Sequence, residues 1–220
     1  MVPGSNVSAG QAVYTPLTLL FYDLVVLGVS NHLLWRCPTR HLRAHYQRHI
    51  GARHLDIGVG TGYFLDKADW PDLPRITLMD LNPHSLAAAA KRIHRYGPAV
   101  KIANCLEPFP LEPGFDSIGF SYLLHCVPGR LPSKAAVFDN AARVLAPGGV
   151  VFGSTILQGD APRSGPAQAL MDFYNRKGIF SNAGDTRADL AHALESRFEE
   201  VELRMEGAVA LFAARAPRHP

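Results

Sequence analysis

From residue 53 onward, the chain alternates short apolar runs with longer stretches of helical period. The runs predict strands over 53–57, 75–80, 99–103, 115–120, 149–156, 198–205 and 207–214. The longer stretches predict helices over 62–68, 83–96, 133–145, 165–177 and 186–196. This alternation indicates an α/β fold, with a mainly parallel sheet and helices on both of its faces. The last two strands meet at Glu206-Gly207, and we expect them to form a hairpin at an antiparallel edge.

The first 50 residues follow a different pattern. We expect a loose tail over 1–13, an apolar region of two helices over 16–35, and a further helix over 38–49. The apolar side chains of 16–35 are too dense for one exposed helix face, so this region has to pack on something. We therefore predict an N-terminal helical cap or lid, residues 1–50, on an α/β part, residues 51–220, within a single domain overall.

Three glycines at alternate positions, Gly58, Gly60 and Gly62, follow the first predicted strand, which carries Asp56 near its end. A loop without side chains lets its backbone approach a ligand closely, and the next helix would aim free N–H groups at the same place. A phosphate-binding P-loop is excluded because Tyr63 stands where it needs a lysine. The dinucleotide fingerprint is excluded because the third glycine comes one residue early. Asp56 would repel a pyrophosphate but suits a cationic ligand.

The second, third and fourth predicted strands also end in polar groups. Asp80 ends the second strand, and an acid there can accept hydrogen bonds from both hydroxyls of a ribose. Asn82 and Pro83 read as the N-cap and first residue of the next helix. The third strand ends at Asn104-Cys105-Leu106 and the fourth near Ser121-Tyr122. Ligands bind beyond the carboxyl ends of parallel strands, so we expect these segments to meet in one site.

The pattern over 56–62 resembles motif I of the class I S-adenosylmethionine-dependent methyltransferases. The segment 115–125 resembles the motif IV strand and loop of the family, and 144–150 resembles its turn into the fifth strand. The resemblance spans about residues 53–156. It implies a Rossmann-like, seven-stranded sheet whose last strand is inserted antiparallel. It also implies S-adenosylmethionine as cofactor and S-adenosylhomocysteine as product.

The resemblance also implies which residues bind the cofactor. Asn104 stands where the family usually has an acid; its amide can still accept a hydrogen bond from the adenine amino group, or it can simply form a turn. Tyr14 and Tyr22 either point toward the methionine end or are core aromatics of the cap. The predicted set is Tyr14, Tyr22, Asp56, Gly58, Gly60, Thr61, Gly62, Asp80, Leu81, Asn82, Asn104, Cys105, Leu106, Ser121 and Tyr122.

Methyl transfer from a sulfonium is an in-line displacement, so the protein mainly supplies proximity and alignment. A hydroxyl or ammonium acceptor also needs a general base, and His125, just past the fourth strand, is the candidate. Equally, His125 can be a packing residue in the pocket wall. Phe173, Tyr174 and Phe180 follow the fifth strand and could line an acceptor pocket with the N-terminal helices. The same segment can be read as a helix end capped by Gly178.

Composition limits the other classes of function. The net charge is only +3, and the basic residues are scattered, which argues against a nucleic-acid partner. A loose His/Arg cluster over 36–53 reads as a solvated helix face, and His32, His45 and His84 as surface residues. Three cysteines without metal or disulfide spacing favour the reducing cytoplasm and predict no metal site. No segment has the length and apolarity of a membrane-spanning helix.

Together, the residues and the resemblance predict an enzyme that methylates a small, rather apolar molecule, such as a secondary metabolite. Two alternatives stay open. One is a non-methylating enzyme, such as a cyclase, that uses the same fold and cofactor; the other is a cofactor-binding protein without catalysis. Neither the attacking atom of the acceptor nor the choice between monomer and homodimer follows from the sequence.

Overall fold

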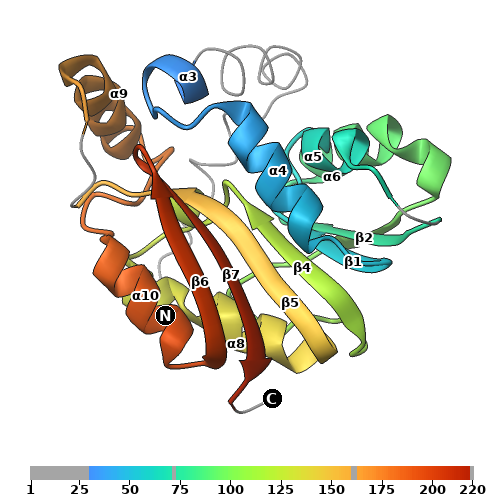
Figure 1. Ribbon diagram of the computed structural model, residues 1–220. Helices are drawn as coiled ribbons and strands as arrows, with labels where there is room; N and C mark the ends of the chain where they lie inside the picture. Colours follow the sequence, from blue (N-terminus) through green and yellow to red (C-terminus); the bar gives the residue numbers. More distant parts are fainter. Residues whose placement is uncertain (1–29, 71–72, 160–162, 219–220) are drawn as a thin grey trace.

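The computed structural model describes residues 30–70, 73–159 and 163–218. Within them, seven strands form one sheet in the order β3-β2-β1-β4-β5-β7-β6 (Figure 1). The strands are β1 (Arg53–Ile57), β2 (Arg75–Asp80), β3 (Ala99–Ile102), β4 (Phe115–Ser121), β5 (Leu145–Ile156), β6 (Phe198–Glu206) and β7 (Val209–Pro217). The helices are α3 (Asn31–Leu33), α4 (Thr39–His49), α5 (Tyr63–Lys67), α6 (Pro83–Arg92), α7 (Leu131–Lys134), α8 (Ala136–Val144), α9 (Gly165–Arg176) and α10 (Arg187–Glu195), with 3₁₀ turns η2 (His94–Tyr96) and η3 (Leu124–Cys126).

The sheet confirms the predicted mostly parallel arrangement with an antiparallel edge. Strands β1 to β5 pair in parallel. Strand β7 is inserted between β5 and β6 and runs antiparallel to both. The hairpin turns at Gly207, whose φ of 58° is a left-handed conformation that suits glycine. Periodicity alone could not give the strand order, because it carries no information on which strands are neighbours.

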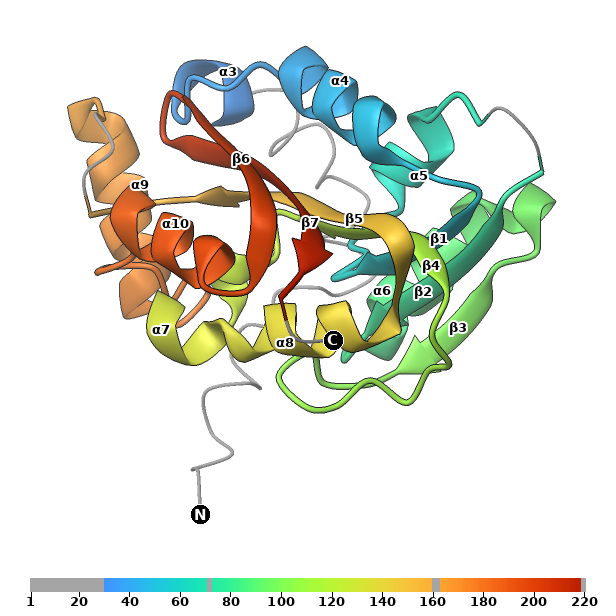
Figure 2. The ribbon, with the colours of Figure 1, turned by 60° about the horizontal axis from the view of Figure 1, so that its bottom comes forward.

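Helices cover both faces of the sheet (Figure 2). On one face, side chains of α4, α5 and α6 pack with Phe152 and Ala213 of the central strands. On the other face, side chains of α7, α8 and α10 pack with Val151 and Phe212. Adjacent residues of β5 and β7 therefore face opposite layers, as the two-residue period of a strand requires. Helix α9 lies to the side, next to α3 (Figures 1 and 2).

Several element boundaries differ from the sequence-based prediction: the helix predicted over 83–96 ends at Arg92, for example, and the last strand is Val209–Pro217. The helix predicted over 133–145 is two helices, α7 and α8, because Phe138 N–H bonds back only three residues, to the Ala135 carbonyl. The fifth strand starts at Leu145 rather than 149, since Leu145 already pairs with Phe115. The register then shifts between Phe115 and Ser117, where Pro147 and Gly148 bend the chain.

Helix α4 corrects the interpretation of the His/Arg cluster as a solvated face. Its inner side is buried: His45, Tyr46 and His49 are all less than a tenth exposed. His45 is thus no surface residue, and its Nε2–H donates to the Phe212 carbonyl at 3.0 Å. Desolvation by this burial lowers its pKa to about 4. The prediction was wrong because histidine counts as a polar residue in a sequence pattern, whereas the imidazole rings of His45 and His49 pack against Phe152.

The N-terminal cap is described only from residue 30, so Tyr14 and Tyr22 lie outside the described residues. His32 and His84 are exposed, as predicted. Among the helices that the structure describes, none has both the length and the apolarity needed to cross a membrane. The division into a cap, 1–50, and an α/β part, 51–220, stays a prediction.

Candidate cofactor site

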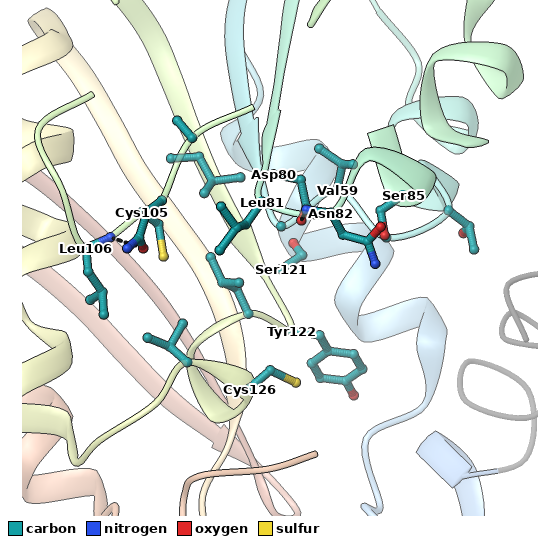
Figure 3. Close-up of a pocket in the computed structure, with 18 of the residues that line it drawn as sticks. Val59, Asp80, Leu81, Asn82, Ser85, Cys105, Leu106, Ser121, Tyr122 and Cys126 are labelled. Carbon is teal, nitrogen blue, oxygen red and sulfur yellow. Dashed lines mark hydrogen bonds between the residues drawn. The ribbon is translucent and has the colours of Figure 1, made fainter. Parts of the chain in front are cut away.

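A cavity opens where β1, β2 and β4 end and the segment after β3 begins (Figure 3). Eleven of the predicted cofactor-binding residues line it: Gly58, Gly60, Thr61, Asp80, Leu81, Asn82, Asn104, Cys105, Leu106, Ser121 and Tyr122. Asp56 and Gly62 do not line it. Four separate strand ends are therefore brought to one site by parallel pairing, as the sequence predicts.

The loop between β1 and α5 has the backbone that only glycine adopts easily. Gly58, Gly60 and Gly62 have φ angles of 72°, 51° and 72°. A Cβ on Gly58 would lie 2.6 Å from a Leu123 methyl, and a Cβ on Gly62 would lie 3.0 Å from Ala89 Cα. Gly60 lines the cavity, and a Cβ there would meet nothing within 4 Å. The loop is therefore a cradle with open space over Gly60.

Asp80 presents a carboxylate at the end of β2. Its Oδ1 accepts the backbone N–H of Asn82 at 2.8 Å, and Asn82 in turn caps α6 by accepting from His84 N–H at 2.9 Å. Burial raises the Asp80 pKa to about 6, although hydrogen bonds from the backbone N–H groups of Asn82 and Val59 lower it in part. The position fits a partner that donates hydrogen bonds, such as a pair of ribose hydroxyls.

Asp56 has a different environment, on the face of β1 covered by α4. The Tyr46 hydroxyl donates to its Oδ2 at 2.6 Å. The Tyr46 oxygen lies 2.9 Å from His54 Nε2, and His54 Nδ1 lies 2.8 Å from the Ser117 hydroxyl. Gly51 N–H donates to the same hydroxyl at 2.8 Å. With a proton on Nε2, His54 donates to the Tyr46 oxygen and accepts the Ser117 hydroxyl at Nδ1, so this chain of hydrogen bonds runs in one direction and ends on Asp56.

Asn104 forms a turn and also lies in the cavity wall. Its Oδ1 accepts Leu106 N–H at 3.1 Å, which forms a local turn, and its Nδ2 donates to Glu107 Oε1 at 3.2 Å. The residue also lines the cavity. Turn formation therefore does not remove the amide from the site.

Tyr122 is strained at the end of β4. Its φ is 58°, which is an outlier for a bulky residue. Its N–H donates to the Ser154 carbonyl at 2.8 Å, and its hydroxyl donates to Asn31 Oδ1 of α3 at 2.7 Å. Asn31 is fully buried and also donates to the Thr39 hydroxyl at 3.1 Å. These bonds hold the ring in the cavity wall beside Cys126 (Figure 3).

His125 lies behind this wall, because it is 3% exposed and does not line the cavity. Its Nδ1 accepts Ile156 N–H at 3.3 Å, and the Thr155 hydroxyl lies at the same distance. Its ring packs edge-on against Phe180, with centroids 4.5 Å apart. Burial lowers its pKa to about 3.

The three predicted acceptor residues belong to an aromatic group outside the cavity. Phe180 is buried and contacts the rings of Tyr174 and Trp35, at centroid distances of 4.9 Å and 6.3 Å. Phe173 packs on Tyr174 but is 42% exposed. Gly178, with a φ of 68°, ends α9 as the alternative interpretation predicted. Trp35, Tyr174 and Phe180 share one apolar cluster with Tyr122 and Cys126 of the cavity wall, and Phe173 lies outside that cluster.

Sequence reasoning missed several residues of the site. Ser85 could have been found, since it lies in the first turn of the helix capped by Asn82. Tyr46 and Asn31 gave no signal, because both act from the N-terminal segment through contacts that only the fold creates. Among the described residues, no three His, Cys, Asp or Glu side chains gather as a metal site would need. The missed cavity residues are Ile57, Val59, Tyr63, Phe64, Ser85, Ala103, Leu123, Cys126, Val127 and Pro128.

The chain is similar to known methyltransferases along most of its length. Residues 55–151 match a family model described as a methyltransferase domain. The demethylluteothin O-methyltransferase of Streptomyces thioluteus is 45% identical over 207 residues, which cover 93% of this chain and 90% of that protein. The physcion biosynthesis cluster O-methyltransferase of Aspergillus chevalieri is 39% identical, covering 95% and 96%.

Solved structures agree on the fold. The structure of DhpI in complex with SAH superposes with a TM-score of 0.71, covering 99% of this chain and all of that one, at 14% sequence identity. At that identity the likeness shows the fold alone. The relatives in sequence show that the chain belongs to the S-adenosylmethionine-dependent methyltransferases, and the glycine cradle, the strand-end acid and the fold agree with this.

Proposed function

We propose that the protein transfers the methyl group of S-adenosylmethionine to an oxygen atom of a small, rather apolar acceptor. The observation that carries this proposal is the cavity, which joins the glycine loop to the strand-end carboxylate of Asp80. Oxygen as the attacking atom is supported by the names of two relatives, both O-methyltransferases. A secondary metabolite as acceptor is supported by the second of these names, which refers to a biosynthesis cluster.

The residues of the cavity suit this cofactor. We assign Asp80 to the ribose hydroxyls, Asn104, Cys105 and Leu106 to the adenine, and the loop over Gly58 and Gly60 to the methionine end. When bound, the cofactor supplies a methyl carbon activated by a cationic sulfur. The protein then holds the two reactants in line and excludes water. Asp56 and Gly62 contribute through their neighbours, since neither lines the cavity.

We assign the acceptor to the side of Tyr122 and Cys126, beyond which Tyr174 and Phe180 form an apolar wall. His125 fits the wall better than the role of base. With a pKa of about 3 it is a weak proton acceptor, and its Nδ1 is already engaged by the backbone of β5. A cytoplasmic location and a monomeric or homodimeric state stay predictions, for fractionation and light scattering to test.

Isothermal calorimetry tests the cofactor assignment. We expect S-adenosylhomocysteine to bind and NAD not to bind. Gly60→Val should lose cofactor binding, because the added side chain enters the cavity. Gly97→Val is the matched control: Gly97 also has a positive φ, 56°, and open space, but lies outside the cavity. Binding of NAD alone, or equal affinities in the two variants, would contradict the assignment.

Transfer itself is tested with methyl-labelled S-adenosylmethionine. Demethylluteothin, the molecule in the name of the Streptomyces relative, is the first acceptor to try, followed by metabolite extracts. We expect label in an apolar product whose new methyl group is an ether by mass spectrometry. Label on nitrogen, carbon or sulfur would overturn the assignment to oxygen but leave methyl transfer standing.

A further inference from the structure

One face of helix α6 lies against the cavity and the glycine loop. Ser85 lines the cavity, Ala89 lies under Gly62, and Arg92 reaches Thr61. These three residues follow each other by four and three positions, so they share one face of the helix. Ser85 and Ala89 are almost fully buried, which leaves no room for the loop to approach α6 more closely.

Arg92 is the polar member of this face and makes three contacts to the loop. One of its terminal NH₂ groups, Nη1, donates to the Thr61 carbonyl at 3.1 Å and to the Thr61 hydroxyl at 2.8 Å. Its guanidinium also lies 5.8 Å from the centre of the Tyr63 ring, within the range of a cation–π contact. Thr61 and Tyr63 line the cavity, whereas Arg92 does not. Apart from its charge, which acts at a distance, Arg92 can therefore affect a ligand only through the loop.

The loop needs such a support. Three glycines in left-handed conformations leave many other conformations open to the free chain. Within residues 58–62, the loop has one internal backbone hydrogen bond, from Gly62 N–H to the Val59 carbonyl at 2.9 Å. A site that is formed only part of the time binds with an affinity reduced by that fraction. A contact that fixes the loop before binding therefore raises affinity without touching the ligand.

We propose that Arg92 is a positioning residue of the cofactor site, which holds the Gly60-Thr61-Gly62 turn in its binding conformation. The proposal rests on the proposed function, because it names the residue that organises the same site. The contrasting case is Arg95 on the following turn. Arg95 binds Asp66 at 2.8 Å and lies over the Tyr96 ring, so it makes contacts of similar chemistry but none to the loop.

The test compares Arg92→Met with Arg95→Met. In Arg92→Met we expect the Kd of S-adenosylhomocysteine to rise about tenfold by calorimetry. In the ligand-free protein we expect the amides of residues 60–63 to exchange hydrogen about tenfold faster. Arg95→Met should change neither quantity. Thermal unfolding of both variants establishes that they are folded. Unchanged loop exchange or an unchanged Kd in Arg92→Met overturns the proposal, as does an equal loss in Arg95→Met.

Two further variants separate positioning from general charge. Arg92→Lys keeps the charge but cannot span both Thr61 oxygens, so its affinity should lie between wild type and Arg92→Met. Thr61→Val removes one acceptor, and its effect should be smaller in the Arg92→Met background than in wild type. Additive losses would overturn the proposal. If the wild-type protein does not bind S-adenosylhomocysteine, the proposed function is contradicted as well. If the wild-type protein binds and Arg92→Lys binds equally well, only the charge of residue 92 matters, and the positioning role of Arg92 is contradicted alone.

Discussion

Strand β1 carries Asp56 near its end and β2 ends in Asp80, and a loop and a helix follow each strand. The two carboxylates nevertheless have different partners. Asp56 faces α4 and accepts the Tyr46 hydroxyl, whereas Asp80 accepts backbone N–H groups and lines the cavity. The comparison teaches that an acid near a strand end is open to a ligand only where no helix covers it.

The largest expected effect is on the cavity side of this comparison. Asp80→Ala should raise the Kd of S-adenosylhomocysteine by at least about a hundredfold, since it removes two charge-assisted hydrogen bonds worth about 1.5–3 kcal/mol each. Folding should not suffer, because the ionised carboxylate is desolvated in the ligand-free protein. Calorimetry and urea unfolding measure the two quantities. Asp116→Ala, at an exposed acid of β4, is the control. Equal affinities in both variants would remove Asp80 from the site.

The opposite result is expected at Asp56. Asp56→Leu leaves the buried Tyr46 hydroxyl without its acceptor, so it should lower the free energy of unfolding by about 2 kcal/mol. The Kd of S-adenosylhomocysteine should change less than threefold when measured well below the unfolding midpoint. In the Asp56→Leu background, Tyr46→Phe should lower the free energy of unfolding by less than it does in wild type, because the Tyr46 hydroxyl has already lost its acceptor. A stable Asp56→Leu protein with lost affinity would reverse the comparison.

Acidic pH should weaken cofactor binding through Asp80. Its folded-state pKa is raised to about 6, and ribose hydroxyls donate to the ionised form, so binding releases a proton below that pH. Affinity should therefore fall up to tenfold between pH 6 and pH 5, and Asp80→Asn should show a flat profile. The folding stability of the ligand-free protein should depend on pH with the opposite sign. The neutral Asp80 carboxyl favours the folded state, and this contribution to the free energy of unfolding is lost as pH rises through about 6. A sloping profile in Asp80→Asn would assign the titration to another group.

The smallest effect should follow substitution at His125, which extends the comparison to the end of β4. His125→Gln keeps an acceptor for Ile156 N–H, so turnover should fall less than tenfold with an unchanged pH profile. Loss of a general base would instead lower turnover by about 10²–10⁴-fold. The measurement needs the acceptor identified by the labelling experiment. A loss of a hundredfold, together with a vanished acid limb, would restore His125 as the base.

Local patterns were sufficient to predict the elements, because strand and helix periods, caps and glycine turns are properties of a few neighbouring residues. The strands from β1 to β4, the Asn82 cap with Pro83, and the Glu206-Gly207 hairpin all follow from such signals. The prediction of a single helix over 133–145 was wrong because it, too, rested on local patterns alone. A break at Ala135 leaves the apolar period on both sides intact, so the pattern does not reveal it.

The sequence by itself determined that four strand ends carry polar or glycine groups, and the rule that ligands bind at such ends joined them into one site. Only the tertiary structure decided which of these groups are open to a ligand. Whether α4 covers Asp56, whether Asn31 holds Tyr122, and whether Arg92 reaches Thr61 depend on residues far apart in the chain. Such contacts arise from packing, which fixes distances that neither spacing nor composition encodes.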